Sequence, residues 1–486
     1  MLFNSYIFIL FFLPLALALY FGLNGLGRET GAKWALIGMS LWFYAYFHIS
    51  YLPLILGSLL FNFPLSRLIG GRSGQRSGKI LLATGIAANL GIIFYYKYFN
   101  FFLESSNAWF GTDFAMRKIL MPLGISFFTF QQISWLVDSY RMETADCRPV
   151  DYALYITFFP QLVAGPIVLH DEMIPQFGDK SLKRLDQDRL AAGIRLFAIG
   201  LFKKVLIADT LGRGADWGFA NPQVLTAPDV AVVSILYTLQ LYFDFSGYCD
   251  MACGIAGMFG FELPLNFNSP YKAVSIQDFW KRWHMTLTRF LRKYLYFPLG
   301  GSRKGTVRTW INILIVFTVS GIWHGAGWTF ILWGLIHGIA SVLYRIFKCV
   351  WDRLPRSVGW LATFVFVDLT WILFRADSLE SAAVLYGKLL APWDWSLNGA
   401  LLSQFDLLEF TYVEEHVAAL GALAARLPFM HMALILAVAL SVALIPRNCH
   451  EKKFVPGAVN AVGSIVMLVW SIMSLSGLTT FLYFNF

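Results

Sequence analysis

Two histidines lie in apolar sequence, where an imidazole would act away from bulk water. His284 occurs in the run WKRWHMTLTRF, and His324 occurs in SGIWHGAGW. Neutral imidazole, whose ordinary pKa is about 6.5, accepts a proton from a hydroxyl group near neutral pH. It also carries an acyl group transiently when it acts as a nucleophile. These two side chains are therefore the first candidates for acid–base or acyl-transfer chemistry.

The sequence around His324 places this residue at membrane depth. The apolar run 310–323 covers about 21 Å if it is helical, against a hydrocarbon core of roughly 30 Å. Gly325 and Gly327 then break the helix, and the chain returns through residues 328–344. Broken backbone in a bilayer needs protein or water around it, and an ionisable side chain there is costly. We therefore predict a functional role for His324.

A second feature is the basic and aromatic stretch that contains His284. If residues 280–295 form one helix, the apolar side chains share one face and the cations share the other. The apolar face comprises Trp280, Trp283, His284, Leu287, Phe290, Leu291, Tyr294 and Leu295. The basic face comprises Lys281, Arg282, Arg289, Arg292 and Lys293. Such a helix lies in a membrane interface, where its cations bind either anionic lipid or the phosphates of a ligand.

Other polar side chains in apolar sequence have two interpretations. We interpret His337 as a hydrogen-bonded packing residue, and position alone leaves His284 open between packing and chemistry. The run LQLYFDFSGYCDMACG contains Asp244, Ser246 and Asp250. These three either satisfy broken backbone or pair with arginine, or they line a site.

Composition identifies the class of protein. The chain has 486 residues, of which 57% are hydrophobic and only 14% are charged, whereas soluble proteins have about 25% charged residues. This composition predicts a polytopic membrane protein. The net charge of +9 is explained by basic cytoplasmic loops, and no nucleic-acid-binding motif accompanies it. Cys249 and Cys253 have no neighbouring histidine, so we expect packing residues and neither a metal site nor a cofactor.

The apolar runs predict an all-α membrane protein with one embedded domain, residues 1–486. Runs near 5–23, 34–50, 51–66, 80–96, 119–137, 191–209 and 229–262 supply spans before the His284 region. The first lacks a basic start and is too long for a signal peptide, so it is expected to be retained. Residues 151–169 are short and rich in Gly and Pro, which favours a re-entrant segment over a kinked span.

Clusters of Lys and Arg predict the orientation in the membrane. The loops expected to face the cytoplasm contain Arg28 and Lys33, 67–79, Arg141 and Arg148, 180–189, 272–308, 345–356 and 447–453. Residues 391–425 form an acidic segment without Lys or Arg, which predicts the opposite side. Both termini are then also expected outside. The aromatic residues of 391–425 suggest an interaction surface, or else a lid on the membrane domain.

Several motifs in order along the chain resemble the membrane-bound O-acyltransferase family. They are PLGISFFTFQQISWLVDSYR (122–141), FFPQLVAGPI (158–167), FKKVLIADT (202–210), LYFDFSGYCDMA (241–252), NFNSPY (266–271), DFWKRWHMTLTRFLRKYLYFPLGG (278–301) and GIWHGAGWTFILWGLIHG (321–338). The resemblance is closest to the bacterial branch that acts on alginate, peptidoglycan and teichoic acid. It covers residues 1–377, and the terminal FLYFNF suits the alginate-type group. No family motif is found between these two parts.

The resemblance implies a fold and a set of site residues. The fold is all-α, with about 11–13 membrane helices plus re-entrant and interfacial helices around a central tunnel. His324 in the W-H-G motif is expected to be the catalytic histidine, and His284 in the R-W-H motif the second hallmark residue. The residues expected to bind substrate or donor are Trp323, Arg282, Trp283, Asp244, Ser246, Asn268 and Arg289.

The resemblance also implies a reaction and partners. The protein is expected in the bacterial inner membrane, among membrane lipids, taking acetyl from cytoplasmic acetyl-CoA to O-acetylate an alginate-like exopolysaccharide or a cell-wall glycan. Because no G-x-S-x-G serine is present, either a periplasmic SGNH-hydrolase-like acetyltransferase completes the transfer or the protein acts directly. The alternative is a transporter or channel with buried His and Asp as a proton relay. The lack of an internal repeat speaks against it.

Overall fold

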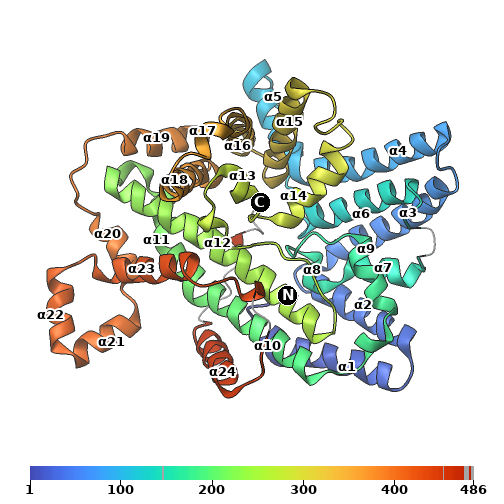
Figure 1. Cartoon of the computed structure of the whole chain (residues 1–486), viewed down its shortest axis with the longest axis horizontal. Helices are drawn as coiled ribbons and strands as arrows, with labels where there is room; N and C mark the ends of the chain where they lie inside the picture. Colours follow the sequence, from blue (N-terminus) through green and yellow to red (C-terminus); the bar gives the residue numbers. More distant parts are fainter. Residues whose placement is uncertain (145–146, 452–453, 476–480, 483–486) are drawn as a thin grey trace.

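The computed structural model describes residues 1–144, 147–451, 454–475 and 481–482, and every regular element in these ranges is a helix. A long central helix, α12 (Ala227–Met258), crosses the molecule beside α10 (Gln187–Phe202) and α11 (Asp209–Ala220) (Figure 1). The N-terminal helices lie on one side of this centre, and α18 (Arg356–Arg375) and the elements after it lie mainly on the other. The all-α prediction is therefore confirmed.

Eight helices in the described ranges are long and apolar enough to cross a membrane. They comprise Phe8–Gly25, Ile49–Gly70, Arg76–Phe110, Ala227–Met258, Thr306–His324, Trp328–Ile346, Arg356–Arg375 and Met430–Glu451. The predicted spans near 34–50, 119–137 and 191–209 overlap the shorter helices α2 (Glu29–Ala45), α6 (Ile125–Tyr140) and α10. The chain is thus a multi-pass membrane protein, as its composition predicted.

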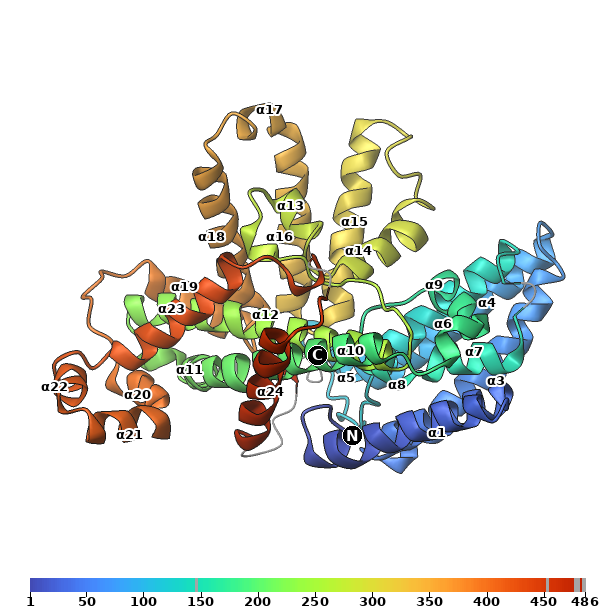
Figure 2. The same cartoon turned by 60° about the horizontal axis from the view of Figure 1, so that its bottom comes forward.

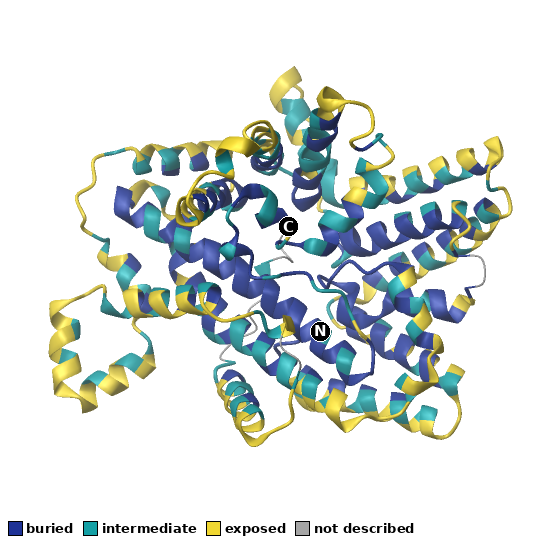
Figure 3. Cartoon of the chain, in the orientation of Figure 1, coloured by how far each residue is buried: buried dark blue, intermediate teal, exposed yellow. Residues whose placement is uncertain are grey.

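The helix α12 is the centre of the core, because nearly all of its residues are buried (Figure 3). It begins with Thr226, whose hydroxyl accepts a hydrogen bond from the Asp229 amide while the Asp229 side chain bonds back to Thr226. Its contact with α10 is made by facing glycines. A Cβ atom on Gly193 would lie 2.6 Å from the Gly254 carbonyl oxygen, and one on Gly200 would lie 2.5 Å from that of Gly247. The two backbones therefore touch, as small residues allow in membrane helix pairs.

A hairpin of α15 (Thr306–His324) and α16 (Trp328–Ile346) carries the W-H-G motif. Figure 2 shows α15, α16 and α18 standing upright above the layer that contains α10, α11 and α12. A Cβ atom on Gly321 would lie 2.3 Å from the Phe330 carbonyl oxygen, so the hairpin crosses closely near His324. The break falls at Gly325 to Gly327, where the backbone is extended. The predicted helix end at His324 is confirmed.

The stretch around His284 differs from its prediction. Residues 280–295 do not form one helix: α13 (Ile276–Trp280) ends, a turn follows, and α14 (Met285–Leu291) leads into the π-helical turn η8 (Arg292–Tyr296). His284 adopts a left-handed conformation with φ 45° and ψ 52°, which interrupts the helix. The prediction of a continuous amphipathic helix was wrong because backbone hydrogen bonds with residues 266–268 replace the helical ones. The Asn268 amide donates to the Arg282 carbonyl (2.9 Å) and the Met285 amide to the Asn266 carbonyl (2.9 Å).

The segment predicted to be re-entrant consists of two short helices instead of one span. These are α7 (Pro149–Thr157) and α8 (Phe159–Leu162), followed by a non-helical connection to α9 (His170–Gly178). Residues from Val150 to His170 are almost entirely buried. This is the local structure expected of a re-entrant segment, because its irregular backbone is surrounded by protein.

The C-terminal third contains a peripheral segment, residues 399–426, at the edge of the molecule. The helices α20 (Gly399–Leu402), α21 (Leu408–His416) and α22 (Ala418–Arg426) follow α19 (Leu379–Leu389) at the edge of the molecule. In Figure 3, α21 and α22 are largely exposed. After them, α23 (Met430–Leu444) and α24 (Ala458–Met473) return to the central helices.

Candidate active site

His324 is the last residue of α15, and its side chain is buried. Its Nδ1 atom lies 2.6 Å from the carbonyl oxygen of Ser320, one turn earlier in the same helix. A carbonyl only accepts hydrogen bonds, so Nδ1 carries the hydrogen. This bond fixes the tautomer and leaves Nε2 as the basic nitrogen.

His284 is held by residues distant in sequence. Its Nδ1 atom lies 3.1 Å from Oδ1 of Asn266, which also accepts a hydrogen bond from the Thr286 hydroxyl (2.8 Å). The Asn266 amide nitrogen donates to Cys249 Sγ (3.3 Å), so this network assigns Oδ1 as the acceptor and Nδ1 of His284 as the donor. Nε2 of His284 is then the basic nitrogen, as it is in His324.

Asn266 is a site residue that the sequence interpretation missed. The NFNSPY motif contains two asparagines, and only Asn268 was predicted to bind donor or substrate. Asn268 instead contacts Arg282 through its backbone, since its carbonyl oxygen accepts from Arg282 Nη1 (3.3 Å). The motif was the available signal, but the spacing did not tell which amide side chain faces the histidine.

The two imidazole rings lie close together in an aromatic enclosure. Their centroids are 6.4 Å apart, and Trp323 contacts both rings, with its centroid 4.9 Å from His324 and 6.0 Å from His284. Trp333 (5.2 Å) and Phe374 (5.4 Å) also face His324. Burial lowers the pKa of His284 well below its ordinary value, and the neighbouring His324 adds to this shift. His284 is therefore a neutral imidazole at pH 7.

His337 and Trp283 belong to the packing around these rings. His337 accepts a hydrogen bond from Trp280 Nε1 at Nδ1 (3.3 Å), and its Nε2 lies 3.0 Å from the Thr370 hydroxyl. Both of its nitrogens are thus occupied. Trp283 stacks on Phe279 with ring centroids 5.6 Å apart, which supports the turn before His284.

Two of the predicted donor-binding arginines face carboxylates. Arg282 Nε donates to Asp278 (2.9 Å), and Arg289 forms a bidentate pair with Glu172, with one N–O distance of 2.7 Å. Arg289 also donates to the carbonyl oxygen of Ile167 (3.1 Å). These arginines join α14 and the preceding turn to neighbouring segments, and their charges are already neutralised.

A cavity of about 910 Å³ lies between α13, α14, η8, α15 and α16. The cationic residues in its lining are Lys281, Arg292, Arg303, Lys304 and Arg345. Trp280, Leu287, Ile313, Val316 and Phe317 supply apolar wall, and Ser320 also lines the cavity. Because the Ser320 carbonyl binds His324, the cavity reaches the helical turn that carries the candidate catalytic histidine.

Asp244 and Asp250 of α12 are engaged by lysines of the π-helical turn η5 (Lys203–Ala208). Lys204 lies 2.7 Å from Asp244, and Lys203 lies 2.6 Å from Asp250. α12 is continuous here, but Asp244 also accepts a hydrogen bond from the backbone amide of Leu482 (3.0 Å), and the cations are lysines in place of the expected arginines. Ser246, the third predicted residue of this run, is buried.

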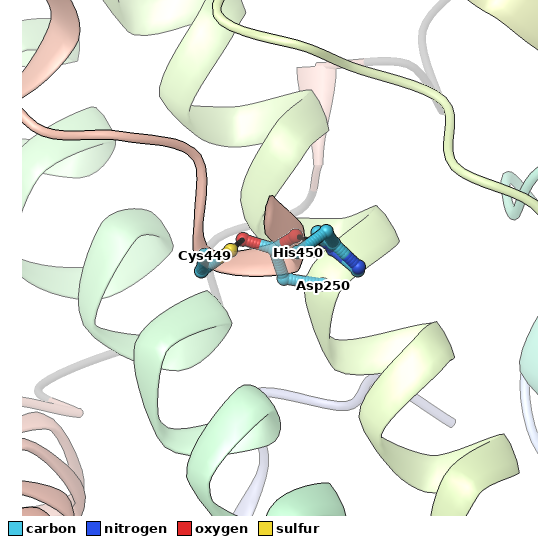
Figure 4. A group of neighbouring side chains, drawn as sticks. All are labelled: Asp250, Cys449 and His450. Carbon is cyan, nitrogen blue, oxygen red and sulfur yellow. Dashed lines mark hydrogen bonds and ion pairs between the residues drawn. The ribbon is translucent and has the colours of Figure 1, made fainter. Parts of the chain in front are cut away.

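Asp250 also joins α12 to the loop after α23. Figure 4 shows Asp250 with Cys449 and His450: His450 Nε2 lies 2.9 Å from Asp250 Oδ1, and Cys449 Sγ lies 3.7 Å from Oδ2. The three side chains are close enough to bind one metal ion. The carboxylate is already paired with Lys203, however, so we interpret the cluster as a polar link between two segments.

The chain belongs to the membrane-bound O-acyltransferase family, whose model matches residues 86–383. The match includes both candidate histidines, the α15–α16 hairpin and the whole cavity lining. The protein is therefore an O-acyltransferase, as the motifs had indicated.

Similar proteins carry more specific descriptions. The chain is 43% identical to a peptidoglycan O-acetyltransferase of Helicobacter pylori, over 83% of this chain and 81% of that protein. It is 38% identical to a probable alginate O-acetylase, AlgI, of Pseudomonas putida, over 82% of each chain. A teichoic acid D-alanyltransferase of Bacillus subtilis is 28% identical over 49% of this chain. The O-acetyltransferases thus match most of the chain, whereas the D-alanyltransferase matches about half.

Proposed function

We propose that this protein is a polysaccharide O-acetyltransferase of the bacterial inner membrane. It takes acetyl from cytoplasmic acetyl-CoA and delivers it to an extracytoplasmic glycan, either an alginate-like polymer or peptidoglycan. The similarity to O-acetyltransferases of both polymers over most of the chain supports this class of acceptor. The buried pair of histidines beside a basic cavity supports acyl transfer as the chemistry.

The cavity of about 910 Å³ is the observation that carries the proposal. Its size falls in the range of ordinary ligand sites, roughly 300–1,000 Å³. Its cations suit the phosphates of CoA, and the apolar wall leading to Ser320 suits the pantetheine arm. The thioester would then reach His324 from the side on which the basic loops gather.

His324 acts as the general base in the proposed reaction. Its Nε2 takes the proton of the acceptor hydroxyl while the oxygen attacks the thioester carbonyl carbon. The C–O bond forms, the C–S bond breaks, and the proton passes from His324 to the departing CoA thiolate. In a second route, Nε2 itself attacks the thioester carbonyl carbon, the C–S bond breaks and the CoA thiolate leaves; the hydroxyl oxygen then attacks the acetyl carbon, the C–N bond breaks, and the hydroxyl proton passes through the freed Nε2 to the thiolate. Detection of an acetylated His324 peptide after acid quenching would favour the second route.

His284 orients the donor or stabilises charge beside His324. Asn266 directs its Nδ1–H away from the reacting atoms, so Nε2 is the nitrogen available on the side of the ring pair. The left-handed backbone at His284 supports this role, because such strain in a non-glycine residue concentrates at functional sites.

A periplasmic partner completes the transfer in this proposal. The outward face is assigned to residues 391–425, which lack Lys and Arg and include α21 and α22. An SGNH-hydrolase-like acetyltransferase docked there would receive acetyl from the membrane protein and pass it to the glycan.

Purified protein in detergent, supplied with radiolabelled acetyl-CoA, tests the chemistry. The proposal expects CoA release that depends on His324. A transporter or channel with a proton relay would show no His324-dependent thioester turnover, and that result would overturn the proposal. Mass spectrometry of the extracellular polymers from cells with and without the protein would then identify which glycan is acetylated.

A further inference from the structure

Lys97 is a cation within the membrane-crossing helix Arg76–Phe110. Its Nζ atom lies 2.6 Å from the carbonyl oxygen of Trp323 and 3.0 Å from that of His324. It also lies 5.9 Å from the centre of the Trp323 ring, a distance that allows a cation–π contact. A side chain more than 220 positions away in sequence therefore contacts the backbone of the candidate catalytic residue.

The end of α15 needs hydrogen-bond donors from elsewhere. The last carbonyls of any helix lack partners within the helix, and membrane depth offers little water to replace them. The following backbone serves the Gly321 carbonyl, which accepts from the Gly325 amide (3.4 Å), and it is extended at Gly325 and Gly327. Lys97 supplies donors to two of these carbonyls at once, which an ammonium group with three N–H bonds can do.

The positive charge adds something that a neutral donor would not. An ionisable side chain within a membrane-spanning segment is costly and marks a functional position by default. The C-terminal end of a helix is the negative end of its dipole, so an ammonium placed there is favoured. The adjacent Tyr98 shows the neutral solution, since its hydroxyl donates to the carbonyl oxygen of Ile322 (2.8 Å). The two neighbours together contact three consecutive carbonyls.

The local backbone around Lys97 is also unusual. Lys97 and Tyr98 lie in the π-helical turn η3 (Phe94–Tyr98), between α4 (Arg76–Ile93) and α5 (Phe99–Phe110). Such turns insert a residue into a helix, which changes the direction of the side chains, and they occur often at functional sites. Here the altered turn presents Lys97 and Tyr98 to the end of α15.

We propose that Lys97 is a positioning residue for acyl transfer. Its ammonium holds the backbone of the W-H-G turn and thereby fixes the direction of the His324 imidazole. Because Nδ1 of His324 is bound within its own helical turn, any movement of that turn moves Nε2 with it. This inference rests on the proposed role of His324.

Four variants test the role of Lys97: K97M, K97R, Y98F and H324A. Each is measured for kcat and KM in acetyl-CoA turnover, and its folding is checked by size exclusion and thermal unfolding.

We expect K97M to lower kcat by about 100-fold, because a misplacement near 1 Å costs that much. KM should change by no more than about twofold, since donor binding is unaffected. K97R, which restores charge and donors, should recover at least about a tenth of wild-type kcat. Y98F should remain within about threefold of wild type, because one neutral hydrogen bond is lost.

The possible results separate the two proposals. A folded K97M protein with wild-type kcat, alongside an inactive H324A protein, would overturn the role of Lys97 and leave the proposed function standing. An active H324A protein would overturn the proposed function itself. If K97M fails to fold, K97Q retains two N–H donors without the charge, and wild-type kcat in K97Q would also overturn the role. If every neutral variant fails to fold, Lys97 serves folding instead of positioning.

Discussion

The two histidines of the site are held in opposite ways. His324 ends a regular helix, and its Nδ1 binds a carbonyl four residues earlier in the same helix. His284 lies in a left-handed turn between two short helices, and its Nδ1 binds a side chain 18 residues away. His324 is thus held by a local contact within its own helix, and His284 is held by a tertiary contact with a distant residue. One site therefore combines an element specified by its own sequence with one that forms only when the fold is complete.

The largest expected effect comes from removing the locally held histidine. His324→Ala should reduce acetyl-CoA turnover by at least about 10³-fold, because the general base is lost. The protein should still insert and elute as a single species, since the contacts of α15 and α16 at Gly321 remain. His337→Gln is the matched control, a buried histidine of the same hairpin, and should keep most turnover per folded molecule. Retained acetylation in His324→Ala would end the assignment.

His284→Asn distinguishes the contribution of the imidazole from that of the left-handed backbone. Asparagine tolerates the left-handed conformation, so the turn should persist while the imidazole is lost. We expect kcat to fall by about 100-fold, the lower end of the range for a positioned catalytic group. Turnover assays with thermal unfolding would check this. A variant with normal turnover would show that His284 is only a packing residue.

Asn266→Ala tests the tertiary support directly. It removes the acceptor for His284 Nδ1 and for the Thr286 hydroxyl, a loss of roughly 1–3 kcal/mol per buried group. We expect kcat to fall about 10-fold, with a lower Tm. Asn268→Ala is the control, because Asn268 contacts Arg282 through its backbone. Equal effects from both substitutions would argue against a specific role for Asn266.

The cavity charges should affect donor binding more than chemistry. The double variant Arg292→Gln and Lys304→Gln should raise KM for acetyl-CoA about threefold to tenfold, with kcat nearly constant, because partly exposed cations contribute modest attraction. Arg289→Gln should lower stability instead, since Glu172 loses its partner. An unchanged KM in the double variant would favour lipid anchoring as the role of these cations.

The smallest effect on acetyl-CoA turnover is expected from a deletion in the peripheral segment. Deletion of residues 408–426, which form α21 and α22, should leave hydrolysis unchanged and abolish co-purification with a periplasmic acetyltransferase. The many exposed apolar residues of this segment support a docking role. Intact co-purification would favour a lid role for residues 408–426 and would move the docking site to residues 212–228, which include the end of α11 and the connection to α12.

The π-helical turns show a further contrast between sequence and structure. Among the described residues, η3, η5 and η8 carry Lys97, Lys203 and Lys204, and Arg292. These cations contact, respectively, the end of α15, the carboxylates of α12 and the basic cavity. Sequence periodicity predicts an ordinary helix through each of them, because a single inserted residue barely alters the apolar pattern.

Features that depend on local properties could be predicted from the sequence. Apolar composition and length predicted a multi-pass helical protein, and the run 310–323 followed by Gly325 and Gly327 predicted a helix that ends at His324. The ordered motifs predicted the O-acyltransferase family. Each of these depends on hydrophobicity, backbone freedom or motif order, which are read directly from neighbouring residues.

Only the tertiary structure decided the features that depend on distant partners. The left-handed turn at His284 exists because residues 266–268 take its backbone hydrogen bonds, so the helix predicted from its periodicity did not form. Arg289 is committed to Glu172, 117 positions away, and Lys97 reaches His324 across 227 positions. A buried charge or polar group pairs with whichever partner the fold brings within hydrogen-bond distance. The neighbouring residues in the sequence do not indicate which residue that partner is.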